Sequence, residues 1–201
     1  MSEIKVVFFD IGNVLLRFEV PAVLRAISAA VRRHPLRVGR LLWSGGLVDR
    51  IERGRLSSRE LFRIFQEELE YEGDFAAFLR LWCDHFTLDR GAAGLLWRVS
   101  RRMPVYLLSN TNRLHYRFIE DNYRFPSMVK GAALSYRLGL RKPEAGIYRA
   151  ALAMAQAKPQ EAVFIDDLAE NVRGAHRVGM NALRYRGAAR LEKDLKGLGV
   201  L

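Results

Sequence analysis

Four positions of the chain carry polar side chains directly beside short apolar runs, and their residue types could together transfer a phosphoryl group. They are Asp10, Ser109, Lys142 and the pair Asp166–Asp167. An acid at the tip of a hydrophobic strand is costly to bury unless it is paired, binds a metal or takes part in a reaction. A carboxylate, a hydroxyl, an ammonium and an acidic pair are the groups needed for phosphoryl transfer through an aspartyl intermediate.

Asp10 is the candidate nucleophile, because a carboxylate can attack phosphorus and form an acyl phosphate. Attack by one anion on another requires neutralisation of charge, which a magnesium ion supplies. Magnesium prefers oxygen ligands in octahedral geometry. We expect these ligands to be Asp10, the backbone carbonyl of Gly12 and one member of the pair Asp166–Asp167. Gly12 and Asn13 suit a tight turn in which the backbone approaches a ligand.

Lys142 and Ser109 are candidate ligands of the phosphate itself. The ammonium of Lys142 could bridge Asp10 and the phosphate as a point charge, and Ser109 with the backbone of Asn110 could hold phosphate oxygens. Taken singly, Ser109 is better explained as a helix cap and Lys142 as an exposed lysine. The coincidence of all these residues at strand-to-helix junctions favours a site.

Three further residues need an interpretation. Asn171 lies four residues after Asp167, so a helix over 168–178 would turn it back toward the acidic pair, where it would orient Asp167 or Lys142. Of the histidines, His115 follows the Ser109 segment and is a candidate pocket residue, whereas the remaining three are predicted to be structural or exposed: His34, His85 and His176. Cys83 lies among apolar residues and is predicted to be a buried, inert thiol.

The elements that must position these residues alternate between strand and helix in the C-terminal two-thirds of the chain. Strands are predicted over 104–109, 162–165 and 181–185, and helices over 113–121, 144–156 and 168–178. This alternation predicts an α/β fold with a doubly wound, Rossmann-like parallel sheet. In such sheets ligands bind at the carboxyl ends of the strands, where Asp10, Ser109 and Asp166 would lie.

Residues 17–88 break this rhythm and show helical patterns without a convincing strand. Helices are predicted over 20–31 and 36–43, after a capping box that begins at Ser57, and along a stripe from Phe75 to Trp82. We interpret this block as an inserted helical cap over the site, whose aromatic stripes form its own core. The predicted division is a core of residues 1–16 and 89–201 with a cap of residues 17–88.

Composition sets limits on the class of protein. Half of the 201 residues are hydrophobic, enough for a full core, and the one cysteine allows no internal disulfide, which is typical of a reducing cytoplasm. The sequence shows no signal peptide and no apolar run that could span a membrane. The net charge of +11 could favour nucleic acid. However, the arginines stand singly and no nucleic-acid motif accompanies them, so a solvated basic face is the preferred interpretation.

At these residues the sequence resembles the haloacid dehalogenase (HAD) superfamily. Four segments carry the likeness in order along nearly the whole chain: FFDIGNVL, LLSNTNRLH, LGLRKPEAGIY and VFIDDLAENVRGAHRVGM. The helical block resembles the C1 class of cap. Within the superfamily the segments look closest to the sugar-phosphatase branch that includes α-D-glucose-1-phosphate phosphatase.

The resemblance implies roles for particular residues. Asp10 would be the nucleophile, Lys142 the stabilising lysine, and Asp167, with Asp166 beside it, the more direct magnesium ligand, while Ser109 and Asn110 would bind the phosphoryl group. The chain departs from the pattern at Gly12, where most family phosphatases carry a second aspartate that acts as general acid and base. Sugar 1-phosphates have a rather good leaving group and would tolerate this loss.

The resulting expectation is a magnesium-dependent phosphatase of a small phosphorylated metabolite, with a sugar phosphate favoured. A haloacid dehalogenase is the second interpretation, because such enzymes also use an aspartate and lack the second acid. They need no metal, so the pair Asp166–Asp167 argues against it. The third is a catalytically weak relative that binds phosphate or protein. The motifs do not indicate the oligomeric state.

Overall fold

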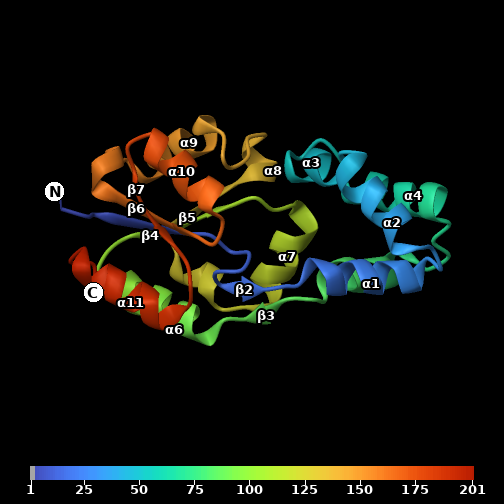
Figure 1. Cartoon of the computed structure of the whole chain (residues 1–201), viewed down its shortest axis with the longest axis horizontal. Coiled ribbons are helices and arrows are strands. Elements are labelled where there is room, and N and C mark those ends of the chain that lie inside the picture. Colours follow the sequence, from blue (N-terminus) through green and yellow to red (C-terminus); the bar gives the residue numbers. More distant parts are fainter. Residues whose placement is uncertain (1–2) are drawn as a thin grey trace.

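A five-stranded parallel sheet occupies the centre of one half of the molecule (Figure 1) in the computed structural model, which describes residues 3–201. The strand order is β5-β4-β1-β6-β7. The strands are β1 (Val6–Phe9), β4 (Val105–Ser109), β5 (Gly131–Leu134), β6 (Ala162–Asp166) and β7 (Asn181–Arg184). Strand β1 lies between β4 and β6, and its Phe9 pairs with Leu107 and Ile165.

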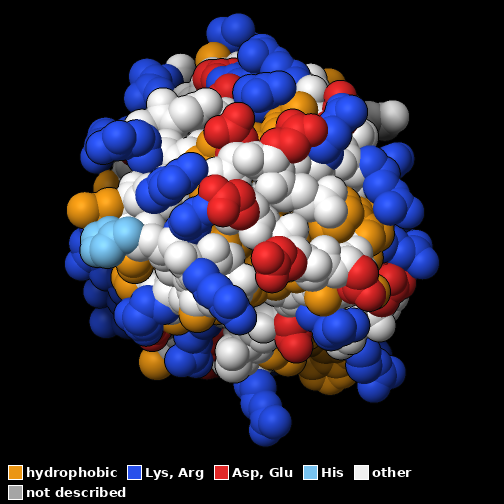
Figure 2. Space-filling model, turned by 90° about the vertical axis from the view of Figure 1, so that its right-hand side faces the viewer, with side chains coloured by type: hydrophobic (Ala, Val, Ile, Leu, Met, Phe, Trp, Pro, Cys, Tyr) orange, Lys and Arg blue, Asp and Glu red, His pale blue; other side chains and the backbone are white. Residues whose placement is uncertain are grey.

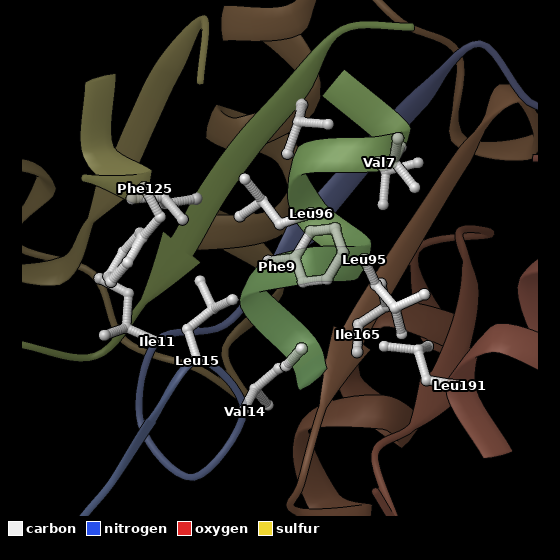
Figure 3. Close-up of a cluster of buried hydrophobic side chains, with 14 of the residues drawn as sticks. Val7, Phe9, Ile11, Val14, Leu15, Leu95, Leu96, Phe125, Ile165 and Leu191 are labelled. Atoms are coloured by element: carbon white, nitrogen blue, oxygen red, sulfur yellow. The ribbon is translucent and has the colours of Figure 1, made fainter. Parts of the chain in front are cut away.

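Helices cover both faces of this sheet, as the doubly wound prediction requires (Figure 1). One face carries α9 (Ala145–Ala155) and α10 (Ala169–Arg177), and the other carries α6 (Arg90–Ser100) and α11 (Ala188–Gly197). Successive side chains of a strand point to opposite faces, so β1 contributes to two cores. Val6 and Phe8 pack beneath α9, whereas Val7 and Phe9 pack against α6 and α11 (Figure 3).

The predicted elements of the sheet domain are confirmed to within two residues at each end. The predicted helix over 113–121 is α7 (Arg113–Asn122), and α10 is followed by Gly179 at φ 85°, which ends the helix as expected. The elements without a prediction are α6, β5, α11 and three short ones: α8 (Ser135–Leu138) and the turns Phe125–Met128 and Pro159–Glu161.

The helices of the inserted block lie beyond one end of the sheet (Figure 1). They are α1 (Val20–Ala30), α2 (Pro35–Gly39) with a π-turn (Arg40–Ser44), α3 (Leu47–Glu52), α4 (Ser58–Leu69) and α5 (Phe75–Cys83). The capping box at the start of α4 is confirmed, since Ser57 and Glu60 each bond the other's backbone N–H. Ile27, Phe65 and Phe78 belong to a hydrophobic cluster distinct from those of the sheet, so the block has a core of its own.

The expectation that residues 17–88 contain no strand is wrong at both ends of this segment. Strand β2 (Leu16–Arg17) pairs antiparallel with β3 (Thr87–Leu88), with Leu16 opposite Leu88 and Arg17 opposite Thr87. Each strand has two residues, which are too few to show an alternating pattern, so the sequence does not predict this two-stranded ribbon. The ribbon places the point where the chain enters the helical block beside the point where it leaves.

The surface of the helical end carries many positive side chains (Figure 2). Lys and Arg are spread over this face, with acidic side chains standing between them rather than set apart (Figure 2). Segment 17–59 alone holds ten arginines and three acids. Within residues 3–201 every helix is too short or too polar to cross a membrane.

Candidate active site

The carboxyl ends of the three central strands bring the predicted polar residues together. Asp10 follows β1, Ser109 ends β4 and Asp166 ends β6, and β1 pairs with both neighbours. The backbone N–H of Asp10 still donates to the carbonyl of Ile165 at 2.9 Å, so the ladder continues to the acid itself. The strands are buried, and the pairing of their residues is fixed. The three side chains are therefore fixed relative to one another.

The ammonium of Lys142 lies between the two acids. Its Nζ is 2.8 Å from Asp10 Oδ1 and 2.7 Å from Asp166 Oδ2, and only 1% of the lysine side chain is exposed. The backbone N–H of Ile11 donates to the same Asp10 oxygen at 2.7 Å. Both contacts fall on Oδ1, and they fix the orientation of the Asp10 carboxylate.

The side chain of Asn110 holds the backbone of Lys142. Lys142 N donates to Asn110 Oδ1 at 2.8 Å, and Asn110 Nδ2 donates to the Lys142 carbonyl at 3.0 Å. The amide is therefore committed to the lysine, which agrees with a phosphate role for the backbone of Asn110 rather than for its side chain. Ser109 is almost fully buried next to it.

Asn171 does face the acidic pair, but its predicted partner is wrong. Its amide donates at 3.0 Å to each oxygen of Asp166, rather than to Asp167 or Lys142. Helix α10 begins only at Ala169, so Asn171 lies in its first turn, where its side chain points back to the end of β6. Asp166 also accepts from the N–H of Leu168 at 2.8 Å. The residue orients the buried acid, and Asp167 stays half-buried beside it.

The acids outnumber the cations in this cluster. One carboxylate oxygen each from Asp10, Asp166 and Asp167 lie within 4.8 Å of one another, and Lys142 is the ammonium among them. Burial raises the pKa of Asp10 to about 7, the charge of Asp166 adds to this, and Lys142 opposes it. Burial also raises the pKa of Asp167. Clustered hard oxygen donors with excess negative charge fit a divalent cation such as magnesium.

Lys142 remains charged in this environment. Burial lowers the pKa of its ammonium, but the charges of Asp10 and Asp166 outweigh this effect and raise the pKa above its ordinary value. The three groups therefore form a buried, mutually dependent set, in which one lysine is shared by two carboxylates.

The loop after β1 takes the expected tight turn. Asn13 adopts a left-handed conformation at φ 51°, its N–H donates to the carbonyl of Leu16 at 2.7 Å, and its Oδ1 accepts from the N–H of Phe18 at 3.2 Å. A Cβ at Gly12 would lie 3.1 Å from Cε1 of the Phe18 ring. The space of a second acid is therefore partly taken by an aromatic ring.

A cavity of about 300 Å³ lies between the strand-end loops and the helical block. Ile11, Gly12 and the segment 109–112 line it on the sheet side. The helical side is mainly apolar, and it includes Val23, Trp43, Val48, Ile51, Trp82 and Phe86. The cavity thus opens beside Asp10 and would receive the part of a ligand that extends away from it.

Ion pairs join the helical block to the sheet domain at one side of the cavity. Arg141 Nη1 is 2.8 Å from Asp49 and its Nη2 is 2.7 Å from Glu52. Arg53, which follows α3, pairs with Glu144 and with Asp49. Since Arg141 directly precedes Lys142, these pairs hold α3 next to the site.

His115 lines the cavity, as its position after the Ser109 segment predicts. Its Nε2 is 2.9 Å from the carbonyl of Trp82, and its Nδ1 is 3.0 Å from the amide nitrogen of Asn112. The carbonyl can only accept and the amide nitrogen can only donate, which assigns the neutral Nε2–H form. Burial, with His85 nearby, lowers the pKa of His115 to about 3. The ring is a wall residue rather than a proton donor.

Cys83 is buried, and burial raises the pKa of its thiol to about 12, which confirms an inert cysteine. The cavity residues of the helical block were not identified from the sequence. Trp82 belongs to the block's own core, as predicted for its stripe, and yet also faces the cavity. Periodicity marks a buried face of a helix but not whether protein or ligand covers it.

Comparison with known proteins places this geometry in a family. The model of the haloacid dehalogenase-like hydrolases matches residues 4–179. The chain is 24% identical over 196 residues to the sesquiterpene phosphatase astK of Aspergillus oryzae, covering 96% of both chains. It is 22% identical over 200 residues to the D-ribitol-5-phosphate phosphatase of Bacteroides thetaiotaomicron, covering 96% of this chain and 97% of the relative. Two further curated relatives are longer proteins, of which the chain spans 35% and 36%.

Solved structures show the same fold. A HAD family enzyme of Bacteroides thetaiotaomicron, in complex with magnesium and inorganic phosphate, superposes with a TM-score of 0.82 at 23% identity, over 92% of this chain and 95% of that one. At this identity the likeness concerns the fold alone. The family match covers β1, β4 and β6 together with Asp10, Ser109 and the pair Asp166–Asp167, and by that match the chain belongs to the haloacid dehalogenase-like hydrolases.

Proposed function

We propose that this chain is a magnesium-dependent phosphomonoester hydrolase that works through an aspartyl-phosphate at Asp10. The observation that carries the proposal is the buried cluster in which Lys142 bridges Asp10 and Asp166 at the carboxyl ends of adjacent strands. A dehalogenase needs a nucleophilic carboxylate but no metal, so it does not account for a second acid, Asp167, beside the Asp166 that holds Lys142. This is why phosphate is preferred over a haloacid.

In the proposed mechanism magnesium would be held by Asp10, by Asp167 with Asp166 beside it, and by the backbone carbonyl of Gly12. The ion, when bound, supplies the positive charge that lets an anionic carboxylate approach an anionic phosphate. The fit rests on this chain's own donors, since three carboxylates with oxygens within 4.8 Å share one ammonium. The full-length phosphatase relatives and the magnesium and phosphate bound to the Bacteroides enzyme support the assignment.

The proposed reaction consists of two successive displacements at phosphorus. An oxygen of Asp10 forms a bond to phosphorus while the bond from phosphorus to the leaving alcohol oxygen breaks, and the alkoxide takes a proton from water. A water molecule then attacks the same phosphorus, its proton passes to solvent, and the bond to Asp10 breaks, which restores the carboxylate and releases inorganic phosphate. One ester and one water give one alcohol and one phosphate.

Lys142 and the loop after β4 would stabilise the charge on the phosphoryl oxygens. The ammonium is fixed by two carboxylates and by the Asn110 amide, so it needs no rearrangement when charge develops. Ser109 and the backbone of Asn110 lie at the start of the segment that lines the cavity, where they would contact the phosphate. Asn171 would act through Asp166 as a positioning residue.

The substrate in this proposal is a small phosphorylated metabolite. The sequence resemblance favours a sugar phosphate, and the ribitol-phosphate relative agrees with it, whereas the sesquiterpene phosphatase points to an apolar alcohol. Position 12 is a glycine, His115 is neutral, and Glu52, a carboxyl group of the cavity wall, is held in an ion pair with Arg141 at 2.7 Å, so we propose that the leaving group departs without help from a general acid. Esters of good leaving groups would therefore react fastest. We also propose residues 17–88 as the cap and 1–16 with 89–201 as the core.

The test measures phosphate release from acetyl phosphate and a panel of phosphate monoesters, with magnesium and with EDTA. We expect metal-dependent release that is lost in Asp10→Asn, while Asp194→Asn, a change at a surface carboxylate of α11, retains it. Halide release from 2-haloacids without metal would instead establish the dehalogenase. Absence of turnover on every ester, with magnesium still raising the melting temperature, would favour the weak phosphate-binding relative.

A further inference from the structure

The cavity beside Asp10 has a wall that is poor in polar groups free to bind a ligand. On the helical side its surface is formed by aliphatic and aromatic side chains, among them Val23, Val48, Ile51 and Phe86. Phe18 closes the side next to Gly12 and packs edge-on against Phe86, with ring centroids 5.9 Å apart. A ligand group held here would exchange water for hydrocarbon contacts.

Apart from the hydroxyl of Thr111, the polar side chains on the sheet side of the wall are already bonded to protein. Asn110 is committed to the backbone of Lys142, and the N–H of Thr111 donates to Ser135 Oγ at 2.9 Å. Asn112 and His115 bond each other, and His115 also bonds the Trp82 carbonyl. These bonds position the strand-end loops rather than leave groups free for a ligand.

The remaining charged groups of the wall pair with each other. Glu52 and Arg141 form an ion pair of 2.7 Å. Three nitrogens of wall residues have no partner among the described residues: Trp82 Nε1, His85 Nδ1 and Arg141 Nε. All three are buried below the surface, so a ligand in the cavity as it stands does not reach them. A polyhydroxylated group would give up its bonds to water and find few replacements, which disfavours its binding.

The mouth of the cavity is apolar as well. Val20 and Trp43 both line it and are exposed, at 43% and 46% of their surface. Exposed side chains of this size are uncommon without a partner when they adjoin an apolar hollow. They extend the hydrocarbon surface from the interior of the cavity to its entrance.

From these observations, and resting on the proposed phosphatase function, we infer that the substrate is a phosphate monoester of an apolar alcohol. Its phosphate lies at Asp10 and Lys142, and its branched or aromatic hydrocarbon part fills the cavity against the helical block. The cavity of about 300 Å³ is at the small end of ligand sites, so one compact hydrocarbon group fits. This replaces the sugar phosphate as the preferred class.

The test compares three substrates: the acyl phosphate acetyl phosphate and the two phosphate esters citronellyl phosphate and D-ribitol 5-phosphate. The last two are both esters of primary alcohols and differ mainly in polarity, while acetyl phosphate is too small to need the cavity. We expect kcat/KM for citronellyl phosphate to exceed that for ribitol phosphate at least about tenfold, because each methylene in a hydrophobic pocket already discriminates about tenfold or more. Equal values, or a preference for ribitol phosphate, would overturn the inference.

A cavity-filling variant separates the cavity from the chemistry. Val48→Phe should raise KM for citronellyl phosphate about tenfold or more and leave acetyl phosphate hydrolysis unchanged. Leu36→Phe, at a residue that is 75% exposed and outside the wall, should change neither. Should Val48→Phe fail to fold, as seen by lost acetyl phosphate hydrolysis, Val23→Phe serves in its place, and an unchanged KM there would contradict the inference.

The phosphatase function and the apolar substrate are tested by different outcomes. If neither acetyl phosphate nor any phosphate ester is hydrolysed, the proposed function is wrong. If acetyl phosphate is hydrolysed in an Asp10-dependent way and citronellyl phosphate is not preferred, the function stands and only the apolar substrate is wrong.

Discussion

Asn110 binds both polar groups of the Lys142 peptide backbone, accepting from its N–H at 2.8 Å and donating to its carbonyl at 3.0 Å. The two residues are 32 positions apart in sequence. Through this pair, the loop after β4 determines where the ammonium between Asp10 and Asp166 can lie.

The first prediction concerns this pair. Asn110→Ala should lower kcat about tenfold to a hundredfold, because a displacement of the order of 1 Å is enough for such a loss. KM should change less, since the backbone of residue 110 is retained. Asn181→Ala is the matched control, because this amide bonds two carbonyls at the opposite end of the sheet. If Asn110→Ala lost as much stability as Asn181→Ala but kept the kcat of the parent chain, a positioning role for Asn110 would be contradicted.

The second prediction concerns the charge of Lys142. Lys142→Met leaves Asp10 and Asp166 buried without their ammonium, and removal of one partner of a buried pair costs about 3–5 kcal/mol. We expect a corresponding decrease in the free energy of unfolding in urea, together with loss of activity. Lys193→Met, a change in helix α11, should alter neither. Added magnesium should recover part of the stability of Lys142→Met, and no recovery would contradict a cation site at these acids.

The third prediction concerns pH in the metal-free protein. The pKa of Asp10 is about 7 in the folded state and 3.8 in its ordinary state, so the folded state holds the proton more tightly. Its contribution to stability is present below pH 4 and is lost as the pH rises toward about 7, with a slope that approaches about 1.4 kcal/mol per pH unit. The raised pKa of Asp167 acts in the same direction.

The histidines oppose this trend, so the Asp10 contribution is measured as a difference. Burial lowers the pKa values of His115 and His85, and their effect is a loss of stability as the pH falls below 6.5. Urea unfolding in EDTA at pH 5 and pH 7.5 should show that Asp10→Asn gains stability over the parent chain at the higher pH. If the difference in the free energy of unfolding between Asp10→Asn and the parent chain were the same at both pH values, Asp10 would titrate at its ordinary pKa.

The fourth prediction concerns the missing acid. Gly12→Asp should raise kcat for ribitol 5-phosphate by about a hundredfold, the usual contribution of a positioned general acid, and leave acetyl phosphate almost unaffected. The new Cβ would meet the Phe18 ring at 3.1 Å, so Phe18→Leu is the companion change that makes room. Gly12→Asn has the same shape without the proton and should give no gain. A gain with asparagine would exclude proton transfer as the cause.

The sheet and the acids at the carboxyl ends of its strands were predictable from sequence because buried parallel strands are continuous apolar runs. Each of β1, β4 and β6 is such a run that ends at a polar residue. Strand β5 has the sequence Gly-Ala-Ala-Leu, whose small residues have low strand propensity, and its place at the sheet edge comes from pairing with β4.

The partners of side chains were harder to predict. Asn171 lies on the expected face of its helix, but the spacing in the sequence does not determine which member of the acidic pair it contacts. The ion pairs of Arg53 with Glu144 and of Arg141 with Asp49 join segments about ninety residues apart, so no local sequence pattern predicts them. The cavity wall is likewise a product of how the block packs on the sheet. The sugar-phosphatase branch and the cap boundaries stay predictions.

The ribbon of β2 and β3 has a consequence for how this protein can vary. Because Leu16 pairs with Leu88, the chain leaves the sheet domain and returns to it at neighbouring points. The strands β4, β1 and β6 therefore keep their register whatever lies between. A helical block of another size or composition could be inserted between Arg17 and Thr87, changing the lining of the cavity while Asp10 and Asp166 stay in place.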